Sequence, residues 1–361
     1  MLSPRAVVQN VPQYHPPLAG REGLRLDFNE NTVGCSPRVL ARLQQLTADD
    51  LARYPEREAV EARVADFLGI DSSELLLTNG VDEAIHLLCQ TYLDPGDEAL
   101  IVVPTYSMYR IYMAAAGANV ISVTSGKAFQ FPAKDLLNHV CSHTRLIAVA
   151  NPNNPTGTVA SRDDLLEIAR NAPHAAMLID EAYFEFYRET LLDQCSELSN
   201  LFVARTFSKA YGLAGLRVGV LAGPVDQMRL LRRVCSPYNV NAVALACVPE
   251  ALADEGYVRT YVREVIEGRA RSERMLADSG IHFWPSQANF VLARIGSTQQ
   301  DATVFVEHMR RRGILVRDRS SDPGCLGCVR ITLGSREQTD RLLSALQEVL
   351  QHAIVMRGAA R

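Results

Sequence analysis

One lysine stands in a segment whose residue types suggest covalent chemistry. The segment reads RTFSKAYGLAGLRVG, and within it Lys209 follows two hydroxyl residues, Thr206 and Ser208. It also lies between two apolar runs, residues 201–204 and 218–222. A lysine amine can form a Schiff base with an aldehyde cofactor, whereas most lysines on loops simply face solvent. The segments that follow the other apolar runs decide between these two interpretations.

Two further polar groups come where apolar runs end. Asp180 ends the run at residues 177–179, so its carboxylate is expected to be partly desolvated and to need a cation or a hydrogen-bond donor. The protonated ring nitrogen of a ligand would provide such a cation and donor. Asn154 stands in NPNNPTG, whose prolines and glycine fix the backbone and present the amide at a strand tip. Taken singly, a helix cap and an elaborate turn would also explain these residues.

A phosphate cradle and a stacking ring follow two earlier runs. Val81 and Asp82 come after a glycine and begin a helical pattern, and a helix start offers free N–H groups and a positive dipole end to a phosphate. Tyr106 follows another run, where its ring could cover a flat ligand. An ordinary turn and a packed tyrosine are the alternatives. Together these segments offer an imine-forming lysine, an acid for a ring nitrogen, an amide for a phenolate oxygen, a phosphate cradle and a stacking ring. This is the set of groups that pyridoxal phosphate requires.

The spacing of the apolar runs predicts an α/β fold. Seven runs read as strands, and several are apolar on successive residues, as in strands covered on both faces of a mostly parallel sheet. Helix-period stretches such as residues 82–93 and 162–171 separate them. Ligands of such open sheets bind beyond the carboxyl ends of the strands. The seven expected strands are residues 75–78, 99–103, 120–123, 146–150, 177–179, 201–204 and 218–222.

The regular alternation of apolar runs and helical stretches ends in the last third of the chain. A long helical stretch at residues 257–279 comes first, and the last helix starts with the capping box Ser335-x-x-Gln338. This pattern predicts a smaller α+β domain. Between the two helices we expect a strand at 289–293, a helix at 301–312 and short strands near 314–316 and 329–333.

We expect three parts in the chain. Residues 1–44 would form an N-terminal arm and part of the small domain, residues 45–250 the large cofactor-binding domain, and residues 251–361 the small C-terminal domain.

Composition excludes several classes of function. Of 361 residues, 47% are hydrophobic and 22% are charged, with a net charge of −4, which is typical of a soluble globular protein and gives no electrostatic reason to bind nucleic acid. No apolar run approaches the roughly 20 residues that span a bilayer. The first 20 residues lack the apolar core of a secretory signal. We therefore expect a cytoplasmic enzyme without nucleic-acid or membrane partners.

The eight cysteines are expected to be reduced and structural. Cys325 and Cys328 have CxxC spacing, but no second CxxC or HxxxH completes four ligands. We assign no metal, and the role of this pair stays open.

The chain resembles the histidinol-phosphate aminotransferase family of the class II, fold-type I pyridoxal-phosphate-dependent aminotransferases. The resemblance covers nearly the whole chain and is strongest in NPNNPTG and SKAYGLAGLRVG. It implies a large domain with a mostly parallel seven-stranded sheet between helices, plus a smaller α+β domain. The other segments that carry it are LDFNENTVGCSP, RYPE, TNGVDEAI, PTYSMY, LIDEAYFEF and GCVRITLGS.

The resemblance also implies roles for individual residues. Lys209 corresponds to the Schiff-base lysine and Asp180 to the partner of the pyridine nitrogen. Asn154 and Tyr183 correspond to the pair that hydrogen-bonds the phenolic oxygen. The cofactor residues it adds are Tyr106 for stacking, Val81, Asp82, Thr206, Ser208 and Arg217 for the phosphate, and Tyr54, which reaches the phosphate across the interface of a homodimer. The substrate residues it implies are Tyr14 and Arg317 for a substrate phosphate, Arg330 for an anionic group, and Asn29 in a loop near the substrate.

The implied reaction is transamination. L-histidinol phosphate and 2-oxoglutarate would give imidazole acetol phosphate and L-glutamate, a step of histidine biosynthesis, by a ping-pong mechanism through Lys209. Thr32 departs from the family's usual proline in the segment NENTVG, which leaves the amino donor open. The alternatives are an aromatic aminotransferase acting on phenylalanine or tyrosine, a decarboxylase of the threonine-phosphate type on the same fold, and a non-catalytic binding module.

Overall fold

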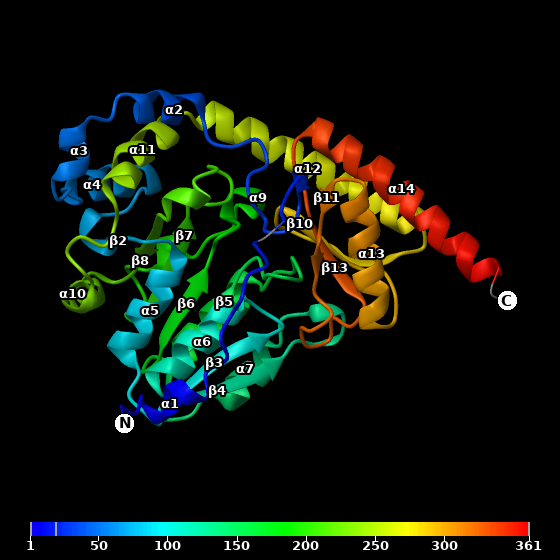
Figure 1. Cartoon of the computed structure of the whole chain (residues 1–361). Helices are drawn as coiled ribbons and strands as arrows, with labels where there is room; N and C mark the ends of the chain where they lie inside the picture. The colour runs from blue at the N-terminus through cyan, green and yellow to red at the C-terminus, as the bar shows by residue number, and fades with distance from the viewer. Residues whose placement is uncertain (1, 19, 360–361) are drawn as a thin grey trace.

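The computed structural model describes residues 2–18 and 20–359. A seven-stranded sheet forms the centre of the larger part of the molecule, and a four-stranded sheet with two long helices forms the C-terminal part (Figure 1). The N-terminal segment starts beside α6 (Ser107–Ala116), contacts the C-terminal part at residues 24–25, and then reaches the helices α2 (Pro37–Gln44) and α3 (Ala48–Ala52) on the far side of the molecule from the C-terminus (Figure 1). This segment therefore connects both parts before the first strand of the large sheet begins.

The large sheet contains all seven strands that the apolar runs predict. Its order is β2-β8-β7-β6-β5-β3-β4, and every neighbouring pair is parallel except the two that involve β8. The carboxyl ends of β3, β5, β6 and β7 therefore meet at one edge. The strands are β2 (Leu75–Thr78), β3 (Glu98–Val103), β4 (Asn119–Thr124), β5 (Thr144–Ala150), β6 (Ala176–Asp180), β7 (Leu201–Thr206) and β8 (Gly219–Ala222).

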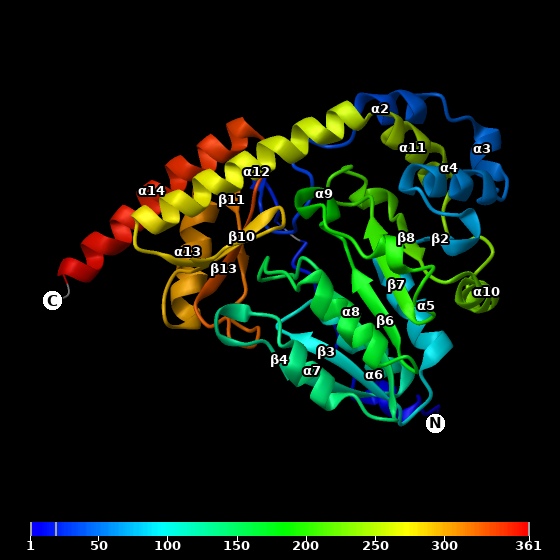
Figure 2. The same cartoon turned by 180° about the vertical axis from the view of Figure 1, so that it is seen from behind.

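Helices cover both faces of this sheet. One face packs against α5, α6 and α10, with Tyr109 and Met113 of α6 buried there. The other face packs against α7 and α8, which lie in front of the sheet when the molecule is seen from behind (Figure 2). Burial on both faces explains why these strands are apolar on successive residues. The helices are α5 (Val81–Tyr92), α6 (Ser107–Ala116), α7 (Ala133–His139), α8 (Arg162–Asn171) and α10 (Val225–Val234).

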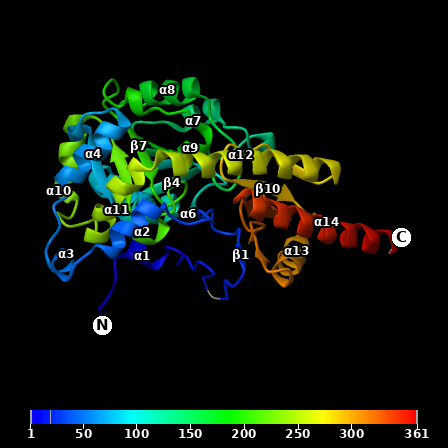
Figure 3. The same cartoon turned by 90° about the horizontal axis from the view of Figure 1, so that it is seen from above.

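The C-terminal part is built on the sheet β12-β13-β10-β9, in which all pairs are antiparallel. The long helix α12 crosses from the region of α2 and α11 to lie against α14 (Figure 3). Ser335 and Gln338 form the expected capping box, because each backbone N–H donates to the other's side chain. The elements are α12 (Glu255–Asp278), β9 (His282–Trp284), β10 (Phe290–Arg294), α13 (Gln299–Arg311), β11 (Ile314–Leu315), β12 (Arg317–Asp318), β13 (Cys328–Thr332) and α14 (Arg336–Ala359).

The structure contains three short strands that the sequence analysis does not predict: β1, β9 and β12. β1 (Leu24–Arg25) pairs in parallel with β11, so it ties the N-terminal segment to the C-terminal part. Where the domain boundaries fall stays a prediction. The remaining helices are α1 (Ala6–Gln9), α2 (Pro37–Gln44), α3 (Ala48–Ala52), α4 (Glu58–Leu68), α9 (Phe184–Tyr187) and α11 (Ala242–Ala253).

Within the described residues, none of the helices combines the length and the apolar character that crossing a membrane requires. The expected cytoplasmic location stays a prediction.

Candidate active site

A cavity of about 530 Å³ opens at the edge where the parallel strands of the large sheet end. The segments after β3, β5, β6 and β7 contribute to its wall, as does the start of α5. Phe28 and Glu30 of the N-terminal segment close it from the side of the C-terminal part. The residues that the sequence predicts for a cofactor and that line this cavity are Val81, Asp82, Tyr106, Asn154, Asp180, Tyr183, Thr206, Ser208, Lys209 and Arg217.

Lys209 points its amine into this cavity. Its Nζ donates to the backbone oxygen of Phe28 at 3.2 Å and lies 6.0 Å from the centre of the Tyr183 ring. Burial, and next the positive charge of Arg330, lower the pKa of Lys209 to about 8. The amine is therefore neutral far more readily than an ordinary lysine, which is the state that a nucleophile or a general base requires.

Asp180 is buried at the end of β6 and forms no ion pair within the described residues. Tyr109 Oη donates to its Oδ2, and the backbone N–H of Ala182 donates to its Oδ1 at 3.0 Å. Burial raises the pKa of Asp180 to about 6 despite these two donors. A buried carboxylate held by hydrogen bonds but lacking a cation fits a ligand that brings a protonated nitrogen.

The start of α5 forms an anion cradle. Gly80 precedes the helix with a φ of 75°, and a Cβ at this position would lie 2.6 Å from a terminal nitrogen of Arg217. Arg217 donates to Asp82 Oδ2 at 3.1 Å, and Tyr106 Oη donates to Asp82 Oδ1 at 2.9 Å. The cradle combines free helix N–H groups with a guanidinium, as a phosphate requires.

Thr206 and Ser208 complete the cradle on the side of β7. Their hydroxyls are 3.0 Å apart, and the backbone N–H of Ser208 donates to Thr206 Oγ1 at 3.1 Å. Both side chains are buried, so they are held in fixed positions.

Tyr183 and Asn154 lie on the side of the cavity near the C-terminal part. Asn29 Nδ2 donates to Tyr183 Oη at 2.9 Å, and Asn29 is only 1% exposed. Thr332 Oγ1 donates to Asn29 Oδ1 at 3.0 Å. Both ends of the Asn29 amide are therefore used within the protein, so the structure makes Asn29 a support for Tyr183. Asn154 Oδ1 accepts from Arg330.

Arg330 and Arg317 stand directly opposite each other on the antiparallel strands β13 and β12. Arg330 donates to the backbone oxygen of Asp27 at 2.7 Å as well as to Asn154. Burial lowers the pKa of Arg330 to about 10, with Arg319 adding to the effect, and burial also lowers the pKa of Arg317. Tyr14, which is partly exposed, is close enough to Arg317 to offset part of that shift.

Tyr54 is the one predicted cofactor residue that lies outside the cavity, on the surface of the chain. It is 78% exposed and stacks on Tyr238 with 4.2 Å between ring centres. It does not line the cavity of this single chain.

Sequence reasoning missed two groups that touch the site. Tyr109 holds Asp180, and the signal for it was present, because Tyr109 follows Tyr106 by three residues in PTYSMY and so lies one helical turn further along α6. No sequence pattern indicates that the Phe28 carbonyl accepts a hydrogen bond from Lys209, because a backbone contact of this kind does not depend on residue type.

Cys325 and Cys328 are buried and unbridged beside Trp284 and Phe129, away from the cavity. No group of three or more metal-ligating side chains occurs in the part of the chain that the structure describes.

The cavity fits pyridoxal phosphate by the chemistry of its walls. The unpaired Asp180 matches the ring nitrogen, the Lys209 amine matches the aldehyde, and the cradle at α5 matches the phosphate. The close approach of Arg217 to Gly80 shows that a side chain at position 80 would block the cradle.

Comparison with known proteins defines the family. Residues 21–346 match the class I and II aminotransferases. The histidinol-phosphate aminotransferase of Geobacillus sp. (strain WCH70) is 35% identical over 339 residues, which cover 91% of this chain and 90% of that protein. The histidinol-phosphate aminotransferase of Roseobacter denitrificans is 36% identical over 334 residues, covering 90% of this chain and 91% of that protein.

Solved structures agree with this assignment. Histidinol-phosphate aminotransferase from Sinorhizobium meliloti, in complex with pyridoxal-5'-phosphate, has a TM-score of 0.88 at 26% identity and covers 97% of this chain and 98% of that chain. L-threonine-O-3-phosphate decarboxylase from Porphyromonas gingivalis has a TM-score of 0.76 at 22% identity over 91% of this chain and 99% of that chain, and shares the fold alone.

The chain therefore belongs to the family of class I and II aminotransferases. The resemblance to the histidinol-phosphate aminotransferases within that family, and the fold-type I architecture, are confirmed. The family also confirms the expected aminotransferase activity and its cofactor, pyridoxal phosphate.

Proposed function

We propose that the protein transfers the amino group of L-histidinol phosphate to 2-oxoglutarate, giving imidazole acetol phosphate and L-glutamate in histidine biosynthesis. The observation that carries the choice of donor is the pair Arg317 and Arg330. The two residues are direct partners across β12 and β13, and neither forms an ion pair within the described part of the chain.

Like charges directly opposite each other in an antiparallel pair repel, and burial makes the repulsion stronger. Burial is the main cause of the lowered pKa values of both arginines, and the positive charge of Arg319 adds to it in both cases, with Arg317 lowering the pKa of Arg330 further. An anion between the two arginines would relieve the repulsion, and the planar guanidinium pairs well with phosphate or carboxylate. The site therefore favours substrates with strong negative charge, such as a phosphate ester and a dicarboxylic keto acid.

The catalytic residues then have distinct tasks. Asp180 holds a negative charge where the ring nitrogen would lie, and Tyr109 fixes the orientation of that carboxylate. Asn154 and Tyr183 would present an amide and a phenol to the ring oxygen, while Ser208 and the start of α5 would hold the phosphate. When bound, the cofactor supplies an electron sink for the substrate's α-carbon.

Lys209 has the position and the pKa of the general base. Its amine is about half neutral at pH 8, and in the neutral form it can accept the proton from the substrate's α-carbon and later donate it. We expect ping-pong kinetics, because the keto product would leave the cavity before 2-oxoglutarate enters to receive the amino group.

The donor assignment predicts the behaviour of the variant Arg317→Gln. We expect KM for histidinol phosphate to rise about 10- to 100-fold with a smaller change in kcat, because hydrogen bonds to charged groups contribute about 1.5–3 kcal/mol. KM for phenylalanine, which carries no phosphate, should change much less. Steady-state kinetics with both donors measure the difference.

The matched control is Arg311→Gln, an exposed arginine on α13 that pairs with Glu307 within its own helix. It should leave both KM values unchanged. Equal losses for the two donors in Arg317→Gln would contradict a phosphate-binding role. Better turnover of phenylalanine or tyrosine by the unmodified protein would favour the aromatic aminotransferase instead.

We also propose that the protein is a homodimer in which Tyr54 completes the partner's cofactor site. The exposed stack of Tyr54 on Tyr238 supports this, because large aromatic groups are enriched at interfaces. Mixing Lys209→Ala chains with Tyr54→Ala chains, with subunit exchange, should recover about a quarter of the wild-type activity, since half of the dimers then hold one complete site. No recovery from exchanged dimers would show that Tyr54 does not act in trans.

A further inference from the structure

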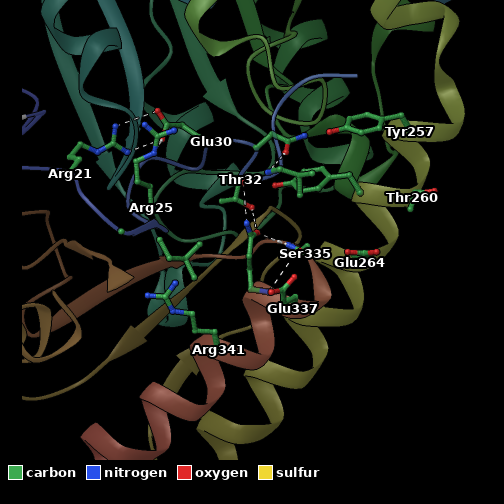
Figure 4. A pocket seen from close by; sticks show the side chains of 16 residues that line it. Arg21, Arg25, Glu30, Thr32, Tyr257, Thr260, Glu264, Ser335, Glu337 and Arg341 are labelled. Atoms are coloured by element: carbon green, nitrogen blue, oxygen red, sulfur yellow. Dashed lines mark hydrogen bonds and ion pairs between the residues drawn. The ribbon is translucent and has the colours of Figure 1, made fainter. Parts of the chain in front are cut away.

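The segment of residues 29–34 lies between the active-site cavity and a second, larger cavity. The outer cavity, of about 920 Å³, is lined by this segment and by the facing sides of α12 and α14 (Figure 4). Glu30 lines both cavities. Through Glu30, the segment therefore contributes to the walls of both cavities.

On the outer side, Thr32 is bound twice to Gln338 of α14. The Thr32 hydroxyl donates to Gln338 Oε1, and Gln338 Nε2 donates to the backbone oxygen of Thr32 at 3.1 Å. Gln338 Oε1 also accepts from the backbone N–H of Ser335 at 3.0 Å. A Cβ at Gly334 would lie 2.6 Å from Thr32 Oγ1, so the glycine permits this close approach. Figure 4 shows Thr32 and Ser335 converging on this contact.

On the inner side, the same segment holds two catalytic groups in place. Asn29 donates to Tyr183 Oη, and Asn31 Nδ2 donates to the backbone oxygen of Ala210, the residue next to Lys209, at 2.9 Å. Asn31 Oδ1 accepts from the backbone N–H groups of Val33 and Gly34, which fixes the turn. A shift of Thr32 would therefore be transmitted to both catalytic side chains.

We propose that Thr32 and Gln338 form a positioning pair that fixes residues 29–34 to the start of α14 and thereby holds Tyr183 and the Lys209 segment in their catalytic arrangement. Proline, the usual residue of the resembling family at this position, has no hydroxyl and cannot make the Thr32–Gln338 side-chain bond. The side-chain bond of the pair therefore depends on the threonine at position 32.

The test compares Thr32→Val with Thr32→Ser. Valine matches threonine in shape but lacks the hydroxyl, whereas serine keeps it. In the apo protein, amide hydrogen exchange in residues 29–34 should become about three- to tenfold faster in Thr32→Val, the effect of one net hydrogen bond, and stay near wild type in Thr32→Ser. In the loaded enzyme, kcat should fall by about the same factor, because Tyr183 and Lys209 lose their catalytic arrangement, while KM for the amino donor changes less.

Thr260→Val is the matched control. Thr260 is exposed on α12 and lines the same outer cavity, but within the described residues it forms no hydrogen bond with the segment. It should change neither exchange nor kcat. Unchanged exchange in Thr32→Val would overturn the proposal, and so would faster exchange with kcat unaltered, because the bond would then be merely structural. The kinetic measurement rests on the proposed function and the exchange measurement does not, so the two can fail separately.

Discussion

Lys209→Ala should lower kcat by on the order of 10⁴-fold or more while the protein stays folded, because it removes both the imine-forming amine and the general base. The side chain makes one hydrogen bond, to the Phe28 carbonyl, so its loss should cost little stability. Turnover of amino donor and keto acid measures the first effect, and the thermal unfolding midpoint measures the second. Substantial activity in a folded Lys209→Ala protein would contradict the assignment.

The chain provides clean controls for this variant, because it contains only two other lysines, Lys127 and Lys134. Both are exposed, and replacing either with alanine should leave kcat unchanged. Borohydride treatment of the loaded enzyme should attach the cofactor to the peptide that contains Lys209. Label on either of the other lysines instead would identify a different site.

The pKa of Lys209 adds a pH signature to the same prediction. Since burial lowers it to about 8 from the ordinary 10.5, the neutral, reactive fraction of the amine grows as the pH rises through 8. The rate at which apo protein captures pyridoxal phosphate should therefore increase with pH and level off above about pH 8. An inflection near 10.5 would show that the amine is not in the environment described.

Asp180→Asn should lower kcat/KM roughly 10²- to 10³-fold, because removing one partner of a buried charge pair costs about 3–5 kcal/mol. Asparagine keeps the size of the side chain and can still accept from Tyr109 or Ala182, so the fold should survive. The substitution removes the charge that would hold a proton on the ring nitrogen, together with one of the two hydrogen bonds that Asp180 accepts. Kinetics and the absorbance spectrum of the loaded enzyme measure it.

The matched control is Asp226→Asn, which removes an exposed carboxylate on α10 whose partner is Arg229 in the same helix. Exposed pairs of this kind contribute little, so activity should not change. If Asp180→Asn kept wild-type kcat/KM, Asp180 would be a structural group and the orientation proposed for the cofactor would be wrong.

The large sheet was predictable because several of its strands are buried on both faces and are therefore apolar on successive residues. Residues 75–77 and 201–204 show this, and both runs lie fully buried in β2 and β7. β9 and β12 were missed because they are short and partly polar, with His282 exposed and Arg317–Asp318 only half-buried. They form strands because they pair with the longer β10 and β13. This pairing depends on the tertiary structure and not on the local sequence.

The cofactor cavity was predictable because strand ends in an open sheet share one edge, so polar residues after each strand must converge there. The supports of these residues were harder to predict. Asn29 and Thr332 are 303 positions apart, and the bonds of the Asn29 amide to Tyr183 and to Thr332 of β13 follow only from the fold. The expected place of Asn29 near the substrate stays a prediction. Thr32 was visible as a departure from the family pattern, but its partner Gln338 follows only from the fold.

The most direct test is a half-reaction followed by absorbance. Purified protein loaded with pyridoxal phosphate would be mixed with histidinol phosphate, phenylalanine, tyrosine, glutamate or threonine phosphate, each without a keto acid. We expect the cofactor to convert to its pyridoxamine form with histidinol phosphate at far lower concentration than with phenylalanine or tyrosine. Absence of this conversion with every donor, or release of carbon dioxide without it, would contradict the assignment of an aminotransferase site to the cavity around Lys209.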